Sequence, residues 1–286
     1  MPSTLHRLAA LALPVVRPYL RVHLALLGRQ VARTPLPQDA PVLEVPGPRP
    51  TRLLVVGELA ASGLGVLLHG MAFPAQVGRE WARVTARGCS WRTVAGLVLS
   101  AERAAAHPDL DEAATPVDAA VVALGIPDVL LATRGADFEA HVEGLVVAVR
   151  ARSAASCPVV LAGLPPMSRF QPMPPLAARL LALRARRLDD AMGRVAERHE
   201  GVTFVPFPVQ RISGLYVRDR FSYRALHRIW AHAVVAALAS TPSSGPATPD
   251  RHVSTPAPAS PPEATTSPGA PPVPSPDDDA RMVLAA

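Results

Sequence analysis

The sequence predicts an α/β fold, a three-layer α/β/α sandwich with a five-stranded parallel sheet. Between residues 51 and 240, short apolar runs alternate with longer segments of helical periodicity, which is typical of βαβ units. The run at Leu53–Val56 has no polar alternation, as expected of a strand that is buried on both faces. Right-handed crossovers between successive strands would then place helices on both faces of the sheet.

The first strand ends abruptly at Gly57 and Glu58, which are followed by small residues, so a tight turn is expected there. The other strands are expected at Trp91–Ala95, Ala119–Leu124, Val159–Ala162 and Val202–Pro206. The helices are expected at Pro74–Arg87, Ser100–His107, Phe138–Arg152, Leu176–Arg198 and Tyr223–Ala239. Ligands of open α/β sheets bind at the carboxyl ends of strands. The segment Gly57–Gly65 is therefore where function is expected.

Both ends of the chain lie outside this alternation. Residues 1–33 form an apolar segment broken by prolines and arginines, which favours a helical extension packed on the domain. Residues 34–50 are Pro-rich and are expected to be a linker. Residues 241–286 are rich in Pro, Ser, Thr and Ala and contain few large apolar residues. They are expected to form a disordered tail, which leaves the domain at residues 51–240.

The N-terminal segment also indicates where in the cell the protein is expected. Its longest uncharged run, Leu8 to Val16, is far short of the roughly 20 residues that a membrane span needs. It also lacks a small-residue cleavage site. We therefore expect a cytoplasmic protein with no clear signal peptide or transmembrane helix. Peripheral contact of this segment with a membrane surface is the alternative.

Two residue types are absent, because the 286-residue sequence contains neither Lys nor Asn. The absence of Lys excludes a Walker-type phosphate loop, a Ser-Lys dyad and Schiff-base chemistry. The absence of Asn excludes an Asn side chain as an oxyanion donor. The net charge of +6 comes from Arg residues scattered without interleaved aromatics, which argues against a nucleic-acid partner. The oligomeric state is left open.

The sequence gives no sign of a metal or cofactor. Cys89 and Cys157 lie in or beside apolar runs and are expected to be small core residues rather than zinc ligands or disulfide partners. The acids and histidine of residues 107–112 are expected in an exposed loop. Gly63 and Gly65 lack the third glycine of a dinucleotide fingerprint. No metal and no cofactor are therefore expected.

Four blocks occur in a characteristic order. They are Gly57-Glu58-x-x-x-x-Gly63-x-Gly65, then Leu124-Gly125-Ile126-Pro127-Asp128, then Gly163-Leu164-Pro165-Pro166, and finally Asp219-Arg220-Phe221 before a helix with Trp230. Together these blocks resemble those of the bacterial SGNH or GDSL-type hydrolases, which are serine esterases and lipases on a flavodoxin-like sheet. The resemblance covers nearly the whole segment that is expected to be ordered, and it implies an SGNH-hydrolase-like fold.

The family's mechanism uses a Ser nucleophile, a His base and an Asp that orients the His, while a Gly and an Asn hold the oxyanion. The resemblance places Leu59 at the nucleophile position and Val98 near that of the oxyanion glycine. Pro127 falls at the position of the oxyanion Asn, although proline has no N–H to donate. Asp219 is retained as the orienting acid, but Ser222 stands where the His is expected.

These replacements predict a pseudoenzyme that has lost the serine-esterase machinery. The expected role is a non-catalytic ligand-binding or interaction module, with a small molecule such as an acyl or ester compound as its ligand. The candidate pocket consists of Glu58, Leu59, Ser62, Gly125, Pro127, Asp128, Asp219 and Ser222. Glu58 and Asp128 are either an acid–base pair or, as favoured, structural acids that hydrogen-bond the loops.

Two other functions remain open. An esterase or lipase with a relocated nucleophile would use Ser62, about one helical turn after the lost nucleophile position, with His227 and Asp219 as partners. His69 and His232 are expected to be ordinary surface or packing residues. The other alternative is a membrane-surface scaffold that is anchored by the N-terminal segment.

Overall fold

The structure is a computed structural model, and it describes residues 18, 22, 25, 26, 29, 31, 33–110, 116–153, 157–169, 173–217 and 220–241. Within these residues, six strands form one sheet in the order β1-β3-β2-β4-β5-β6. The five parallel strands are β2 (Thr51–Glu58), β3 (Cys89–Gly96), β4 (Ala119–Ala123), β5 (Val159–Ala162) and β6 (Val202–Val205). Their order is that of a flavodoxin-like sheet, and this topology confirms the predicted α/β fold.

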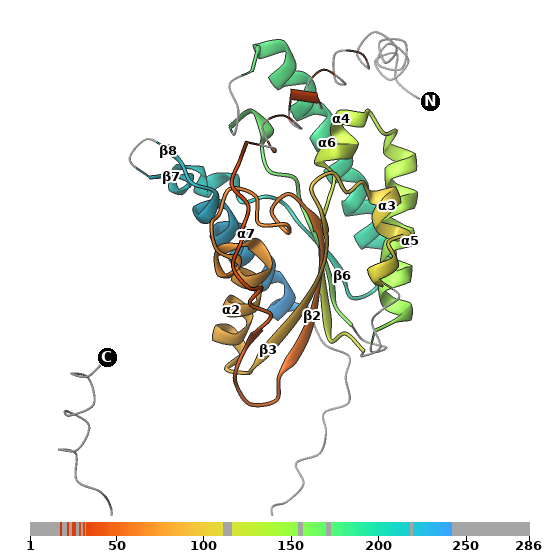
Figure 1. Cartoon of the computed structure of the whole chain (residues 1–286). Helices are drawn as coiled ribbons and strands as arrows, with labels where there is room; N and C mark the ends of the chain where they lie inside the picture. The colour runs from red at the N-terminus through yellow and green to blue at the C-terminus, as the bar shows by residue number, and fades with distance from the viewer. Residues whose placement is uncertain are drawn as a thin grey trace, which may run out of the picture. The chain divides into compact units, whose positions relative to one another are not determined.

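Helices cover both faces of the sheet (Figure 1). On one side lie α2 (Phe73–Thr85) and α7 (Tyr223–Ser240), and on the other lie α3 (Ala101–Ala105), α5 (Gly135–Ala151) and α6 (Pro175–Arg198). The five expected helices are present with ends shifted by at most a few residues. The sequence did not predict α4 (Ile126–Leu131), because a single helical turn beginning at Ile-Pro has no periodicity to detect.

Shorter elements complete the described chain. The 3₁₀ helices are η1 (His69–Met71), η2 (Pro108–Leu110), η3 (Met167–Arg169) and η4 (Val209–Leu215). Strands β7 (Tyr216–Val217) and β8 (Arg220–Phe221) pair as a separate antiparallel ribbon. No helix in the described part of the chain is long and apolar enough to cross a membrane.

The central strand β2 contributes to both halves of the core because successive side chains of a strand point to opposite faces. Leu54 and Val56 belong to the apolar cluster beneath α3, α5 and α6. Leu53 and Val55 belong to the cluster beneath α2 and α7, which also contains Trp230. Burial on both faces explains why this strand appears in the sequence as an unbroken apolar run.

The Pro-rich segment 34–50, which the sequence presents as a linker, packs against the domain. Its strand β1 (Glu44–Val45) pairs antiparallel with β3 at the edge of the sheet. The Pro35 carbonyl accepts a 2.9 Å hydrogen bond from the Gly65 N–H. Proline carbonyls still accept hydrogen bonds, although prolines have no backbone N–H to donate. The packing of residues 34–50 on the domain therefore has no recognisable pattern in the local sequence. The N-terminal extension lies mostly outside the described residues, and so does the predicted tail beyond residue 241.

Gly57 lies near the end of β2, where the surrounding atoms leave no room for a side chain. A Cβ atom there would lie 2.8 Å from the Ala61 Cβ and 3.0 Å from the Ala123 carbonyl oxygen. Both neighbours are short and fixed to backbone, so the strand has no room for a larger residue.

We predict that Gly57→Ala lowers the free energy of unfolding by about 1–3 kcal/mol, because it overpacks the central strand. The matched control is Gly144→Ala on the exposed face of α5, where a Cβ meets nothing within 4 Å. This change should raise stability by up to about 1 kcal/mol through helix propensity. Urea unfolding measures both, and equal stability of the two variants would contradict the prediction.

Candidate functional site

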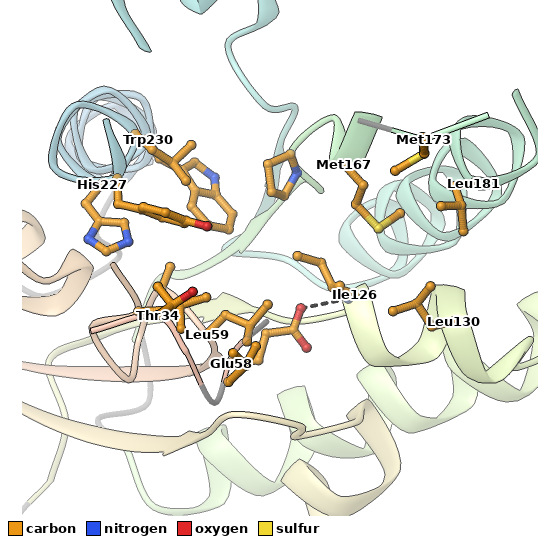
Figure 2. Close-up of a pocket in the computed structure, with 16 residues that line it drawn as sticks. Thr34, Glu58, Leu59, Ile126, Leu130, Met167, Met173, Leu181, His227 and Trp230 are labelled. Atoms are coloured by element: carbon orange, nitrogen blue, oxygen red, sulfur yellow. Dashed lines mark hydrogen bonds between the residues drawn. The ribbon is translucent and has the colours of Figure 1, made fainter. Parts of the chain in front are cut away.

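A mostly apolar cavity lies beyond the carboxyl ends of β2, β4 and β5, where α/β sheets bind ligands (Figure 2). The cavity has a volume of about 90 Å³. The described residues that line it are Val31, Thr34, Glu58, Leu59, Ala60, Leu64, Ile126, Leu130, Pro165, Met167, Met173, Leu181, Tyr223, Leu226, His227 and Trp230.

Glu58 is the last residue of β2, and its side chain is only 4% exposed. Its Oε1 accepts a 2.7 Å hydrogen bond from the Ile126 N–H, while its Oε2 has no partner among the described residues. Burial, reinforced by the charge of Asp128, raises the pKa of Glu58 well above its ordinary value. The protonated form therefore persists to higher pH than for an ordinary Glu, and in that form the proton belongs on Oε2, because Oε1 already accepts from the Ile126 N–H.

Leu59 follows Glu58 with a backbone φ of +32°, in a region that L-residues other than Asn, Asp and Gly seldom occupy. The turn is held by hydrogen bonds from the Ala61 N–H to the Glu58 carbonyl and from the Leu64 N–H to the Leu59 carbonyl, at 2.7 and 2.8 Å. The Leu59 side chain is 8% exposed and lines the cavity. A strained turn thus presents an isobutyl group at the end of the central strand.

His227 lies on α7 and is fully buried. Its Nδ1 lies 3.3 Å from the Met71 carbonyl oxygen, and since a carbonyl only accepts, Nδ1 carries the proton in this contact. Burial lowers the pKa of His227 to about 4, so the ring is neutral near pH 7. Its Nε2 is then a bare acceptor, and it has no partner in the described part of the chain.

Asp128 differs from Glu58 in that both of its carboxylate oxygens accept hydrogen bonds. Oδ2 accepts from the Ala101 N–H at 3.0 Å, and Oδ1 accepts from the Thr133 hydroxyl at 3.1 Å. The bond from Ala101 connects α4 to the first turn of α3, and the bond from Thr133 holds the chain just after α4. Asp128 is 1% exposed, and burial raises its pKa. Since it does not line the cavity, its geometry supports the structural role that the sequence favoured.

The other predicted site residues lie around the cavity rather than in its lining. Ser62 is half-buried in the turn after β2. Gly125 has a φ of +135° and precedes α4, where Pro127 is buried in the first turn. The Ser222 hydroxyl caps α7 by accepting from the Ala225 N–H at 3.2 Å. These residues shape the turns and helix ends that surround the cavity.

Several other predictions concern residues that the described lining does not include. Val98 is 44% exposed, and Asp219 lies outside the described residues. His69 pairs with Asp39 through a 2.9 Å contact between Nδ1 and Oδ1, and His232 contacts Glu80. Of the two described members of the triad of Ser62, His227 and Asp219, His227 lines the cavity and Ser62 does not. In the described chain, no group of three His, Cys, Asp or Glu side chains has the arrangement of a metal site.

The cavity also has walls that sequence reasoning missed. Val31 and Thr34 come from the N-terminal segments, Met167 and Met173 from the region before α6, and Trp230 from α7. Each looks like an ordinary core or linker residue in the sequence. Only the crossing of five distant segments brings them together, so no local pattern could have identified them.

The chain matches the model of the GDSL-like Lipase/Acylhydrolase family over residues 61–232. It is also similar to a solved structure, LAE5, an alpha/beta hydrolase enzyme from the metagenome of Lake Arreo, Spain. The two are 19% identical, with 69% of this chain and 98% of LAE5 covered, and the TM-score is 0.51. This likeness shows a shared fold.

Two further solved structures are similar at lower TM-scores. TesA is 19% identical, with 64% of this chain and 95% of TesA covered and a TM-score of 0.48. AlinE4, a SGNH-hydrolase family esterase, is 19% identical, with 68% and 98% covered and a TM-score of 0.46. No curated protein matches this chain.

The buried imidazole of His227 predicts a specific loss of stability in acid. Because its folded-state pKa is about 4 against an ordinary 6.5, the unfolded chain binds a proton below about pH 6.5 that the folded chain still excludes. Through this residue the free energy of unfolding should fall by about 3 kcal/mol between pH 7 and pH 4.

His227→Gln removes this titration and retains a donor for the Met71 carbonyl. Its stability should therefore fall less than that of the unmodified protein over the same pH range, as measured by urea unfolding at pH 7, 5 and 4. His232→Gln, at a side chain that is 45% exposed, is the control variant. Parallel pH profiles for His227→Gln and the unmodified protein would contradict the assignment.

Proposed function

The chain belongs to the GDSL-like lipase/acylhydrolase family, and we propose that it uses the family's fold as a non-catalytic module that binds a small, largely apolar molecule. The observation that carries this proposal is the side chain of Leu59. It lines the cavity at the end of β2, where the family resemblance places the nucleophilic Ser. A leucine side chain has no atom that can attack an ester.

Ser62, Ser222 and Tyr223 give little support for a replacement nucleophile. Ser62 is absent from the cavity lining, and Ser222 uses its hydroxyl to cap α7. Tyr223 lines the cavity, but burial raises the pKa of its phenol, which disfavours the nucleophilic phenolate. The lining is instead suited to burial of apolar atoms, because leucine, isoleucine and methionine supply eight of the sixteen described lining residues.

An acyl compound is the ligand class that this lining and the family description favour. The family is described by lipase and acylhydrolase activity, and an acyl chain carries apolar carbons beside a polar group.

The packing of Val31 and Thr34 at the cavity supports a domain that begins before residue 51. It also favours an N-terminal segment that packs on the domain over one that serves only as a membrane anchor.

Hydrolysis is tested with p-nitrophenyl butyrate and a fluorophosphonate that labels active serines. We expect a rate equal to that of heat-denatured protein and no serine labelled in the native fold. The matched variant is Ser62→Ala, which should behave like the unmodified protein. Phosphonate-sensitive hydrolysis that Ser62→Ala abolishes would instead establish the relocated nucleophile.

Binding is tested with 1-chlorohexane by ligand-observed NMR. Burial of its chain should give a Kd on the order of 0.1–1 mM. Leu59→Phe enlarges a side chain that lines the cavity and should weaken binding by about tenfold or more. The control is Leu176→Phe, at a leucine that is 74% exposed, and it should bind as the unmodified protein does. Equal binding by the two variants would mean that the probe occupies another place.

A further inference from the structure

A groove between α2 and α7 is lined mainly by charged side chains, and its lining shares no residue with that of the apolar cavity. The groove has a volume of about 470 Å³, within the range of roughly 300–1,000 Å³ that small-molecule sites occupy. Four arginines and one glutamate leave the lining with a formal charge of +3 when its histidine is neutral. The described residues that line it are Gln76, Arg79, Glu80, Arg83, Arg211, Arg228, Ile229 and His232.

The charged side chains come from facing rows on the two packed helices. On α2, Arg79 and Arg83 are four residues apart and therefore occupy neighbouring positions on one helix face. On α7, Arg228 and His232 have the same spacing. Glu80 connects the two rows, because its Oε1 lies 2.7 Å from Nη2 of Arg83 and 2.8 Å from Nδ1 of His232. The arginines of both helices are therefore brought to one place.

Glu80 is the one carboxylate of the described lining, and it is already paired with Arg83. Arg83 donates to both oxygens of Glu80, at 2.7 and 2.9 Å, and this pairing lowers the pKa of Glu80 to about 2. Arg79 donates instead to a neutral backbone carbonyl, at 2.7 Å. Arg211 and Arg228 are exposed, and neither side chain has an ion-pair partner among the described residues. Three guanidinium groups thus carry charge that no carboxylate of the lining offsets.

The arginines between α5 and α6 show a different arrangement on the same protein. There, Arg194 and Arg198 pair with Glu139 and Glu143 at 2.7–3.0 Å, so two cations meet two anions. In the groove, four cations meet one anion. Like charges at neighbouring helix positions repel one another, and an anion held between them would relieve this repulsion. The groove is therefore suited to an anionic ligand, whereas the surface between α5 and α6 is already neutral.

We infer that the groove binds a soluble molecule that carries two or more linked phosphate groups. The planar guanidinium of Arg donates two parallel hydrogen bonds to phosphate oxygens, and three such groups offer more donors than the two oxygens of a carboxylate can use. One phosphate monoester carries a charge of about −1.5 to −2 at pH 7. A single phosphate therefore leaves the lining positive, whereas two linked phosphates balance it. This ligand is independent of the one proposed for the apolar cavity.

The lining favours a soluble anion over a membrane surface or a nucleic acid. It contains no Phe, Tyr or Trp among its described residues, so it offers no platform on which bases could stack. Its one large apolar residue in the described chain, Ile229, is half-buried. Binding to a membrane surface uses apolar side chains that enter the lipid in addition to positive charge. A small anion that enters between the helices needs neither feature.

The test is isothermal titration calorimetry of the full chain with pyrophosphate at low ionic strength. We expect a Kd on the order of 0.1 mM, because charge-assisted hydrogen bonds are stronger than neutral ones. Orthophosphate and succinate should bind about tenfold more weakly or less, since the first has one phosphate group and the second has only carboxylates. Absence of pyrophosphate binding, or equal binding of succinate, would overturn the inference.

A double variant locates the binding site. Replacing Arg211 and Arg228 together by Gln should weaken pyrophosphate binding about tenfold or more. Both side chains are exposed, so the urea midpoint of unfolding should stay unchanged. The matched control replaces Arg179 and Arg186 by Gln, which removes the same charge from exposed positions of α6 on the other face of the sheet. The control should bind as the unmodified protein does. Equal weakening by the two double variants would mean that pyrophosphate responds only to the overall charge, and the inference would fail.

Lipid vesicles distinguish a soluble phosphate compound from a phosphate-bearing membrane surface. The probe is a vesicle of phosphatidylglycerol and phosphatidylcholine, and the readout is sedimentation of the full chain with it. We expect the unmodified protein and the double variant of Arg211 and Arg228 to sediment equally. If the double variant loses sedimentation that the unmodified protein shows, the groove serves a lipid surface and the assignment of a soluble ligand is wrong.

Discussion

The hydrogen bond between the Ile126 N–H and the buried carboxyl of Glu58 is the interaction on which the site depends. It joins the end of β2 to the first residue of α4, which directly follows β4, and so connects the two central strands where they leave the sheet. Gly57 allows this approach, since a side chain there would collide with Ala61 and the Ala123 carbonyl. The turn at Leu59 and the mouth of the cavity follow from that connection.

The two acids at neighbouring strand ends show how similar residues acquire different roles. Asp128 accepts hydrogen bonds with both oxygens, from the Ala101 N–H and the Thr133 hydroxyl. Through the first of these bonds it connects two helices. Glu58 accepts a hydrogen bond from Ile126 with one oxygen, and its other oxygen is buried without a partner in the described part of the chain. A fully bonded carboxylate stabilises loops, whereas burial of a half-bonded carboxyl favours its uncharged form.

The conformation of the turn after β2 is set by its backbone rather than by the side chain of Leu59. The backbone φ of Leu59 is +32°, which an L-residue such as leucine seldom adopts. Hydrogen bonds from the Ala61 and Leu64 N–H groups hold that conformation irrespective of the side chain. Under the proposed function, the leucine side chain makes this position part of an apolar wall.

The sequence by itself determined the layered fold, the five parallel strands and the helices between them, because apolar periodicity follows directly from which faces are buried. It also predicted Glu58 and Leu59 for the candidate pocket, since both lie in one continuous motif, and both line the cavity. Only the tertiary structure decided that His227 and Trp230 line the same cavity, that Asp128 and Ser222 serve the loops and helix ends, and that residues 34–50 pack on the domain. These outcomes depend on contacts between distant segments, and a contact between segments leaves no periodicity in either of them.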